Sequence, residues 1–91
     1  MAQVIKPDGT TEEVAPRNGK SFTLEELYKI IGTDIVERLR VKVNKKEKWM
    51  VIDEEGKCKN SPFNEKATDI YKSPVDFIVG TVVICGLREF R

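Results

Sequence analysis

Apolar residues recur at helical spacing most clearly between residues 22 and 32. The inner face of the predicted helix carries Leu24, Leu27, Tyr28 and Ile31. Thr23 and Glu26 have the spacing of a capping box, in which each side chain bonds the other residue's backbone amide. Phe22 can pack on Leu27 at the helix start, and Gly32 supplies the left-handed residue that often ends a helix. The pattern therefore predicts a helix that begins after Thr23 and ends at Gly32.

Alternating apolar and charged residues predict a strand over residues 34–43. One side carries Ile35, Leu39, Val41 and Val43, interrupted by Glu37, and the other carries Val36, Arg38, Arg40 and Lys42. Residues 44–47 would then turn the chain, and residues 48–53 would return as an antiparallel strand. We expect a second turn at residues 53–56, followed by a short strand at residues 57–59.

Residues 2–15 are predicted to form a β-hairpin at an edge of the sheet. Pro7 presets the first position of its turn, and Gly9 takes the position that needs a positive φ. Further on, Asn64 is a candidate N-cap for a short helix near residues 65–71. The inward side of that helix carries Ala67, Ile70 and Tyr71.

Residues 76–87 are apolar without alternation, which is typical of a strand buried on both faces and therefore central in its sheet. Gly80 within this stretch predicts a bulge or the close approach of another backbone. Together the patterns predict a single α+β domain over residues 1–91, with a small, mostly antiparallel sheet, one well-defined helix and one short helix. Residues 22–87 form its core. Two short helices can hardly cover both faces of the sheet, so we expect a homo-oligomer in which a partner subunit adds cover.

Composition narrows the functional classes. The chain has 16 Lys and Arg against 15 Asp and Glu, a net charge of +1, which argues against a protein that coats DNA. The longest uncharged, mostly apolar run, residues 77–87, is far shorter than the roughly 20 residues of a membrane helix. No signal peptide is expected, so we predict a cytoplasmic protein with no membrane contact. Cys58, in the short polar strand, and Cys85, in the apolar one, are expected to be free thiols.

Several kinds of chemistry lack their usual residues. The chain has no histidine, the commonest general base and metal ligand, and two distant cysteines do not make a zinc site. It contains neither a Gly-x-x-x-x-Gly-Lys-Ser/Thr loop nor a Gly-x-Gly-x-x-Gly turn. The three successive carboxylates in residues 53–56 do not have the spacing of a calcium loop. We therefore expect no metal, no cofactor and no catalytic residues.

A basic stretch is the first candidate site. Arg38, Arg40 and Lys42 share one side of their predicted strand, where they could hold phosphate groups together. The alternative is a solvated sheet face that charge protects from aggregation. Trp49, next to this stretch, could stack on a nucleobase, although a lone tryptophan in a strand also suits the core.

The short helix is the second candidate site. Asn64, Thr68 and Tyr71 could line a ligand site at its N-terminus, where free amides favour anions. The alternative is a capped helix whose Tyr71 packs inward.

Three segments together resemble a small family that is met mainly in bacteriophages and conjugative elements and is labelled a domain of unknown function. They are residues 24–32, residues 50–57 with 64–68, and residues 78–84. The shared pattern is a helix that ends at glycine, an Asp-Glu-Glu-Gly turn, an Asn-x-x-Ala motif and an Ile-Val-Gly-Thr strand. The resemblance implies an accessory protein of a mobile element, which could counter host defence by binding a host protein or sequestering a signalling nucleotide.

The expected function is accordingly that of a non-enzymatic accessory protein that captures a nucleotide-like anionic ligand in the bacterial cytoplasm and could thereby act against host defence. One alternative is an inhibitor or adaptor that binds a host protein through a sheet edge or apolar patch. A second alternative is a nucleic-acid-binding regulator that uses the basic strand face, although the balanced net charge speaks against it.

Overall fold

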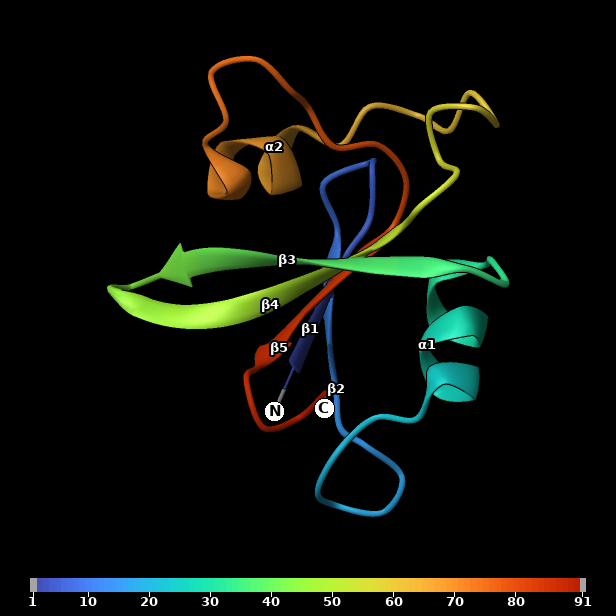
Figure 1. The fold of residues 1–91 in the computed structure, drawn as a ribbon, viewed down its shortest axis with the longest axis vertical. Helices are drawn as coiled ribbons and strands as arrows, with labels where there is room; N and C mark the ends of the chain where they lie inside the picture. The colour runs from blue at the N-terminus through green and yellow to red at the C-terminus, as the bar shows by residue number, and fades with distance from the viewer. Residues whose placement is uncertain (1, 91) are drawn as a thin grey trace.

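The computed structural model describes residues 2–90 as one five-stranded antiparallel sheet with two helices (Figure 1). The elements in chain order are β1 (Ala2–Ile5), β2 (Thr11–Val14), α1 (Leu24–Ile31), β3 (Val36–Val43), β4 (Lys46–Asp53), α2 (Glu65–Tyr71) and β5 (Val82–Gly86). The strand order β2-β1-β5-β4-β3 makes β5 central and leaves β2 and β3 as edges. This architecture confirms the predicted α+β class. Neither helix within residues 2–90 has the length and apolar character needed to cross a membrane.

The two helices lie on opposite sides of the sheet, α2 above it and α1 below it in Figure 1. Two buried clusters follow from this arrangement. The cluster on the α1 face contains Ala2, Val4, Phe22, Leu27, Val51, Val83 and Cys85. The cluster on the α2 face contains Ile5, Val41, Met50, Ala67, Ile78, Val82 and Ile84. Successive residues of β5 alternate between the clusters, which confirms the prediction of a central strand buried on both faces.

The strand β5 is shorter than predicted, because it begins at Val82 rather than at residue 76. Before it, Val79 forms only an isolated bridge with Phe63. Gly80 then adopts a φ of 77°, and its N–H donates to the carbonyl of Pro62 at 2.7 Å. The expected close approach of another backbone at Gly80 is therefore confirmed, and the left-handed residue bends the chain into the strand.

The helix α1 has the predicted ends. Thr23 and Glu26 form the capping box, and Gly32 ends the helix with a φ of 83°. The predicted inner face was partly wrong: the residues that pack on the α1-face cluster are Leu27, Ile30 and Ile31. Leu24, in the first turn, is 45% exposed, because it lies beyond the part of the helix that packs on this cluster.

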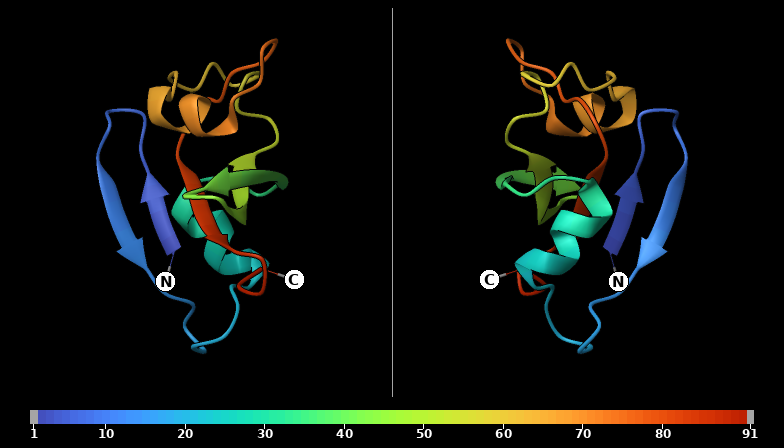
Figure 2. Two further views of the ribbon diagram at one scale, coloured as in Figure 1. Left: turned by 90° about the vertical axis from the view of Figure 1, so that its left-hand side faces the viewer. Right: turned by 90° about the vertical axis from the view of Figure 1, so that its right-hand side faces the viewer.

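The hairpins differ from their predictions at one turn and one strand. Only Asn44 and Lys45, with φ values of 52° and 67°, join β3 to β4, so the turn is two residues long rather than four. Residues 57–59 are turns rather than the predicted strand, because their backbone bonds are local, such as Lys59 N–H to the Glu55 carbonyl at 3.0 Å. The N-terminal hairpin forms, with β2 at the edge, and makes one side of the molecule (Figure 2). Its strand β1, however, contributes Ala2, Val4 and Ile5 to the buried clusters, which the predicted core of residues 22–87 did not include.

Candidate functional site

The basic side chains of β3 gather around a tryptophan of β4. Alternation puts Arg38, Arg40 and Lys42 on the α1 face, and the strand register pairs Arg40 with Trp49. The guanidinium carbon of Arg38 lies 4.4 Å from the Trp49 ring centroid, and that of Arg40 lies 4.8 Å from it. The chain thus brings together the first four predicted site residues. We call Arg38, Arg40, Lys42 and Trp49 the basic shelf.

Acidic groups neutralise little of the basic shelf. Arg38 donates one N–H to the carbonyl of Phe90 at 3.2 Å and lies 5.5 Å from the Phe90 ring centroid. Arg40 pairs with Glu47 at 3.2 Å, and both side chains of this pair are about half exposed, so water screens it. Within residues 2–90, Lys42 makes no ion pair. A guanidinium has five N–H donors, so most donors of both arginines remain available to a ligand.

Trp49 serves as a support for these arginines. Its Nε1 donates to the carbonyl of Leu87 at 3.2 Å, and the half-buried ring packs against the α1-face cluster. The two guanidinium groups lie against the ring, so they occupy the place where a base was expected to stack. Because this contact restricts both side chains, a ligand that binds them has less rotamer entropy to remove.

Asn64 and Thr68 lie on the α2 face and are held by internal hydrogen bonds. The fully buried Asn64 amide donates to the carbonyls of Ile5 at 3.1 Å and Gly80 at 2.8 Å, and its oxygen accepts the Ala67 N–H at 3.1 Å. The Thr68 hydroxyl donates to the Asn64 carbonyl at 2.8 Å. These bonds occupy the groups that a ligand would use. Their ligand role stays a prediction, and we leave both residues out of the site proposed below.

Tyr71 lies in a recess of about 140 Å³ on the α2 face. The apolar lining of the recess consists of Leu39, Ile52, Tyr71, Phe77, Ile78 and Val79. Its charged lining consists of Glu37, Asp53, Glu54, Lys57 and Asp76. We call this recess the acidic groove. The seven predicted residues therefore divide between two opposite faces of the sheet and do not form one site.

Sequence reasoning missed the acidic groove, because its lining comes from β3, β4, the turn after β4, the end of α2 and the segment before β5. One signal was present in the sequence: Glu37 interrupts the apolar side of β3. The structure places Glu37 in the lining of the groove.

The acidic turn after β4 is organised by Asp53. This nearly buried carboxylate accepts the Glu55 N–H at 2.9 Å, the Thr33 hydroxyl at 3.0 Å and the Lys59 ammonium at 3.1 Å. Burial by itself raises the pKa of the Asp53 carboxyl, but these hydrogen bonds outweigh burial and hold the pKa below its ordinary value. Within residues 2–90, no three His, Cys, Asp or Glu side chains are placed to share a metal ion.

The chain matches, over residues 2–90, the model of a family described as "Domain of unknown function (DUF3846)". The match spans nearly the whole chain, so the chain belongs to this family, and the sequence-based resemblance to a family of unknown function is confirmed to that extent. No curated protein and no solved structure shows significant similarity to the chain.

Proposed function

We propose that this member of the family is a non-enzymatic binding protein that captures a nucleotide-like anionic ligand on the basic shelf. The observation that carries the proposal is the pair of guanidinium groups held against one indole ring, 4.4 and 4.8 Å from its centroid. Both groups contact the ring, and most of their N–H donors have no partner within residues 2–90. Neighbouring guanidinium groups of this kind suit bidentate phosphate binding.

The ligand should carry more than one phosphate. Arg38, Arg40 and Lys42 follow one another at every second residue of β3, so they form a row of cations along the strand. Adjacent phosphates of a dinucleotide or a short single strand would each meet a member of this row. The bases would stack on the outer guanidinium planes, because the Trp49 ring is already covered.

The setting of this activity follows from the resemblance to proteins of phages and conjugative elements. In that setting, sequestration of a host signalling nucleotide would serve the mobile element against host defence. A homo-oligomer in which a second copy covers the open shelf would enclose such a ligand better than one subunit can. These points extend the proposal and rest on it.

Titration calorimetry and thermal-shift measurements test the proposal with four probes: a cyclic dinucleotide, a linear dinucleotide, a ten-nucleotide single strand and polyglutamate. We expect saturable binding of at least one phosphodiester probe and an increase of the melting temperature. The Arg38→Ala/Arg40→Ala variant should weaken that binding about tenfold or more, because two charge-assisted hydrogen-bonding groups are lost. A steep loss of affinity with salt would identify the single strand as the preferred source of phosphates.

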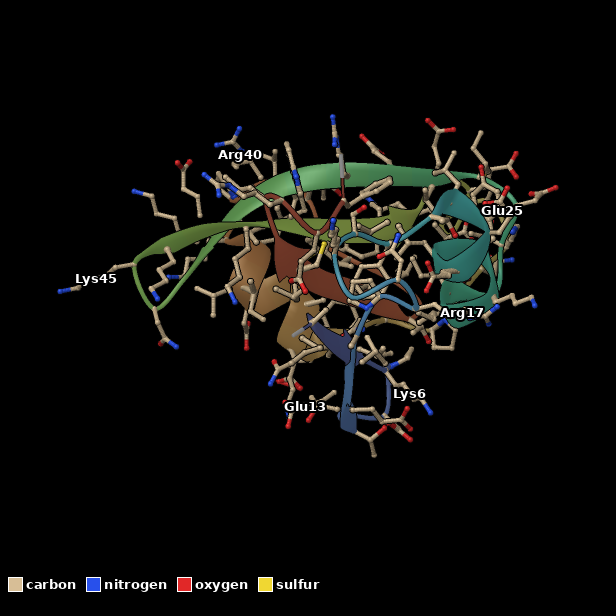
Figure 3. All side chains as sticks on the ribbon, turned by 90° about the horizontal axis from the view of Figure 1, so that it is seen from below. Lys6, Glu13, Arg17, Glu25, Arg40 and Lys45 are labelled. Atoms are coloured by element: carbon tan, nitrogen blue, oxygen red, sulfur yellow. The ribbon has the colours of Figure 1, made fainter. Side chains whose placement is uncertain are left out.

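The matched control is Arg17→Ala/Lys20→Ala, which removes the same charge from exposed positions in the segment before α1. Figure 3 shows Arg17 well apart from Arg40. Equal weakening by both double variants would show that net charge, and not the shelf, attracts the probe. Failure of every phosphodiester probe to bind would contradict the proposal, and binding of polyglutamate alone would favour the alternative of a protein partner.

A further inference from the structure

The acidic groove lies on the opposite face from the basic shelf and has a different chemistry. Six apolar or aromatic side chains line a volume of about 140 Å³. Tyr71 is half-buried in it, and Phe77 is 46% exposed. A small apolar recess with charged groups around it suits a side chain that is apolar along its length and charged at its end.

The charges of the groove are unbalanced. Four acidic residues and one lysine line it. Asp53 bonds Lys59 and Thr33, and Asp76 pairs with Lys57. Within the described chain, the two remaining carboxylates, Glu37 and Glu54, make no ion pair.

The chain itself shows how a cation fits at this place. The Lys57 ammonium pairs with Asp76 and lies 4.5 Å from the Phe77 ring centroid, so it combines an ion pair with a cation–π contact. This arrangement gives the Asp76 carboxylate a counter-charge, whereas Glu37 and Glu54 make no ion pair within residues 2–90. A second cation that entered the groove would meet Glu37, Glu54 and the aromatic residue Tyr71, which also line it.

Apolar side chains continue beside the groove. The Phe63 and Phe77 rings lie 6.1 Å apart, and Phe63 is 53% exposed. Val75, two residues before Phe77, is 92% exposed. Large apolar side chains that cluster on a surface mark a site of protein contact more often than scattered ones do.

We propose that the acidic groove binds a lysine or arginine side chain from a partner protein, in a segment where an apolar residue neighbours the basic one. The basic side chain lays its methylene stem on Leu39 and Ile52 and brings its charge to Glu37 and Glu54. The neighbouring apolar residue packs on Phe63 and Phe77. Charge complementarity selects this occupant, because an acidic or neutral segment would leave both glutamates without a counter-charge.

The test uses a blocked peptide, acetyl-Leu-Lys-Leu-amide, titrated into the isotope-labelled protein while amide resonances are followed by NMR. Saturable shifts are expected at Tyr71, Phe77 and Ile78. The norleucine peptide, which keeps the stem and lacks the charge, should bind at least about fivefold more weakly. Equal binding of the lysine and norleucine peptides, or shifts elsewhere only, would overturn the proposal.

Two variants locate the interaction. Glu37→Gln/Glu54→Gln should weaken binding of the lysine peptide about fivefold, whereas the matched control Glu13→Gln/Glu25→Gln, at exposed sites on β2 and α1, should not. Lys57→Met removes the internal competitor for Asp76 and Phe77 and should tighten binding more than Lys66→Met does. If Lys57→Met and Lys66→Met have the same effect, the groove does not bind the peptide as proposed.

A second copy is the competing occupant, because Lys45 projects from the tip of the β3–β4 hairpin (Figure 3). Concentration of the protein without peptide would then shift the groove resonances, and Lys45→Ala/Lys46→Ala would abolish that shift. This result would overturn the proposal of a separate partner. Binding at the groove does not depend on the basic shelf, so Arg38→Ala/Arg40→Ala should leave the peptide titration unchanged, which separates the two proposals.

Discussion

Replacement of Asn64 by alanine should destabilise the fold far more than an ordinary loss of a helix cap. The side chain connects three elements: it caps α2 at the Ala67 N–H and holds the carbonyl of Ile5 at the end of β1 and that of Gly80 before β5. The residue is fully buried, so water cannot replace the lost bonds. One lost cap and two lost hydrogen bonds to carbonyls amount to about 3 to 5 kcal/mol.

The assay is thermal and urea unfolding of Asn64→Ala against the parent chain. For a domain of this size the melting temperature should fall by about 12 °C or more. The matched control is Asn18→Ala. Asn18 also accepts two backbone N–H groups, from Lys20 at 2.8 Å and Ser21 at 3.0 Å, but it is exposed to water. The control should lose no more than about 1 kcal/mol.

A third variant, Asn64→Asp, separates hydrogen bonding from packing. It keeps the shape of the side chain and the oxygen that caps α2, but it replaces the amide that donates to two carbonyls with a carboxyl group. The folded state should favour the protonated acid, so its pKa is raised. Destabilisation should therefore be smallest below the unfolded pKa of about 4 and should increase as pH rises from there through the raised folded pKa. A loss below about 1.5 kcal/mol for Asn64→Ala, or a pH-independent Asn64→Asp, would refute the reasoning.

Three further predictions concern other sites. Gly80→Ala should cost about 1 to 2 kcal/mol in urea unfolding, because its φ of 77° is unfavourable for alanine although the added Cβ would meet Ser61 only at 3.5 Å. Asp53→Asn should lower the melting temperature at pH 7. Because the pKa of Asp53 is lowered in the folded state, the difference in melting temperature between parent and variant should be full above about pH 4 and should disappear as pH falls through the folded pKa. Burial raises the pKa of Cys85 to about 12, so a thiol reagent at pH 8 should modify exposed Cys58 in the native protein and both cysteines only after unfolding.

The helices could be predicted from sequence because their signals are local. Thr23 and Glu26 lie three residues apart, and so do Asn64 and Ala67, so each cap is complete within one turn of chain. The predicted strand at residues 57–59 failed for the opposite reason. A strand forms only when its backbone can bond to a neighbouring strand, and the backbone hydrogen bonds of this segment are local to its own turns.

The basic shelf was predictable only in part. The period of two along β3 suffices to put Arg38, Arg40 and Lys42 on one face. The partner of Trp49, however, depends on the register of the hairpin. The predicted four-residue turn would pair Trp49 with Lys42, whereas the two-residue turn at Asn44 and Lys45 pairs it with Arg40. The difference of two residues in register leaves Trp49 on the same face as the basic residues but changes which of them lies opposite it.

The net charge of the chain does not reveal how its charges are distributed over the fold. A net charge of +1 speaks against a polyanion ligand only if the charges are evenly mixed. In the fold, alternation along β3 sends Arg38 and Arg40 to the α1 face and Glu37 to the α2 face, where the acidic groove lies. Each face therefore has a local electrostatic potential that differs from what the net charge of the chain would indicate. The basic shelf and the acidic groove share the strands β3 and β4 but no side chain, so the proposed anionic and cationic ligands would not compete for the same groups.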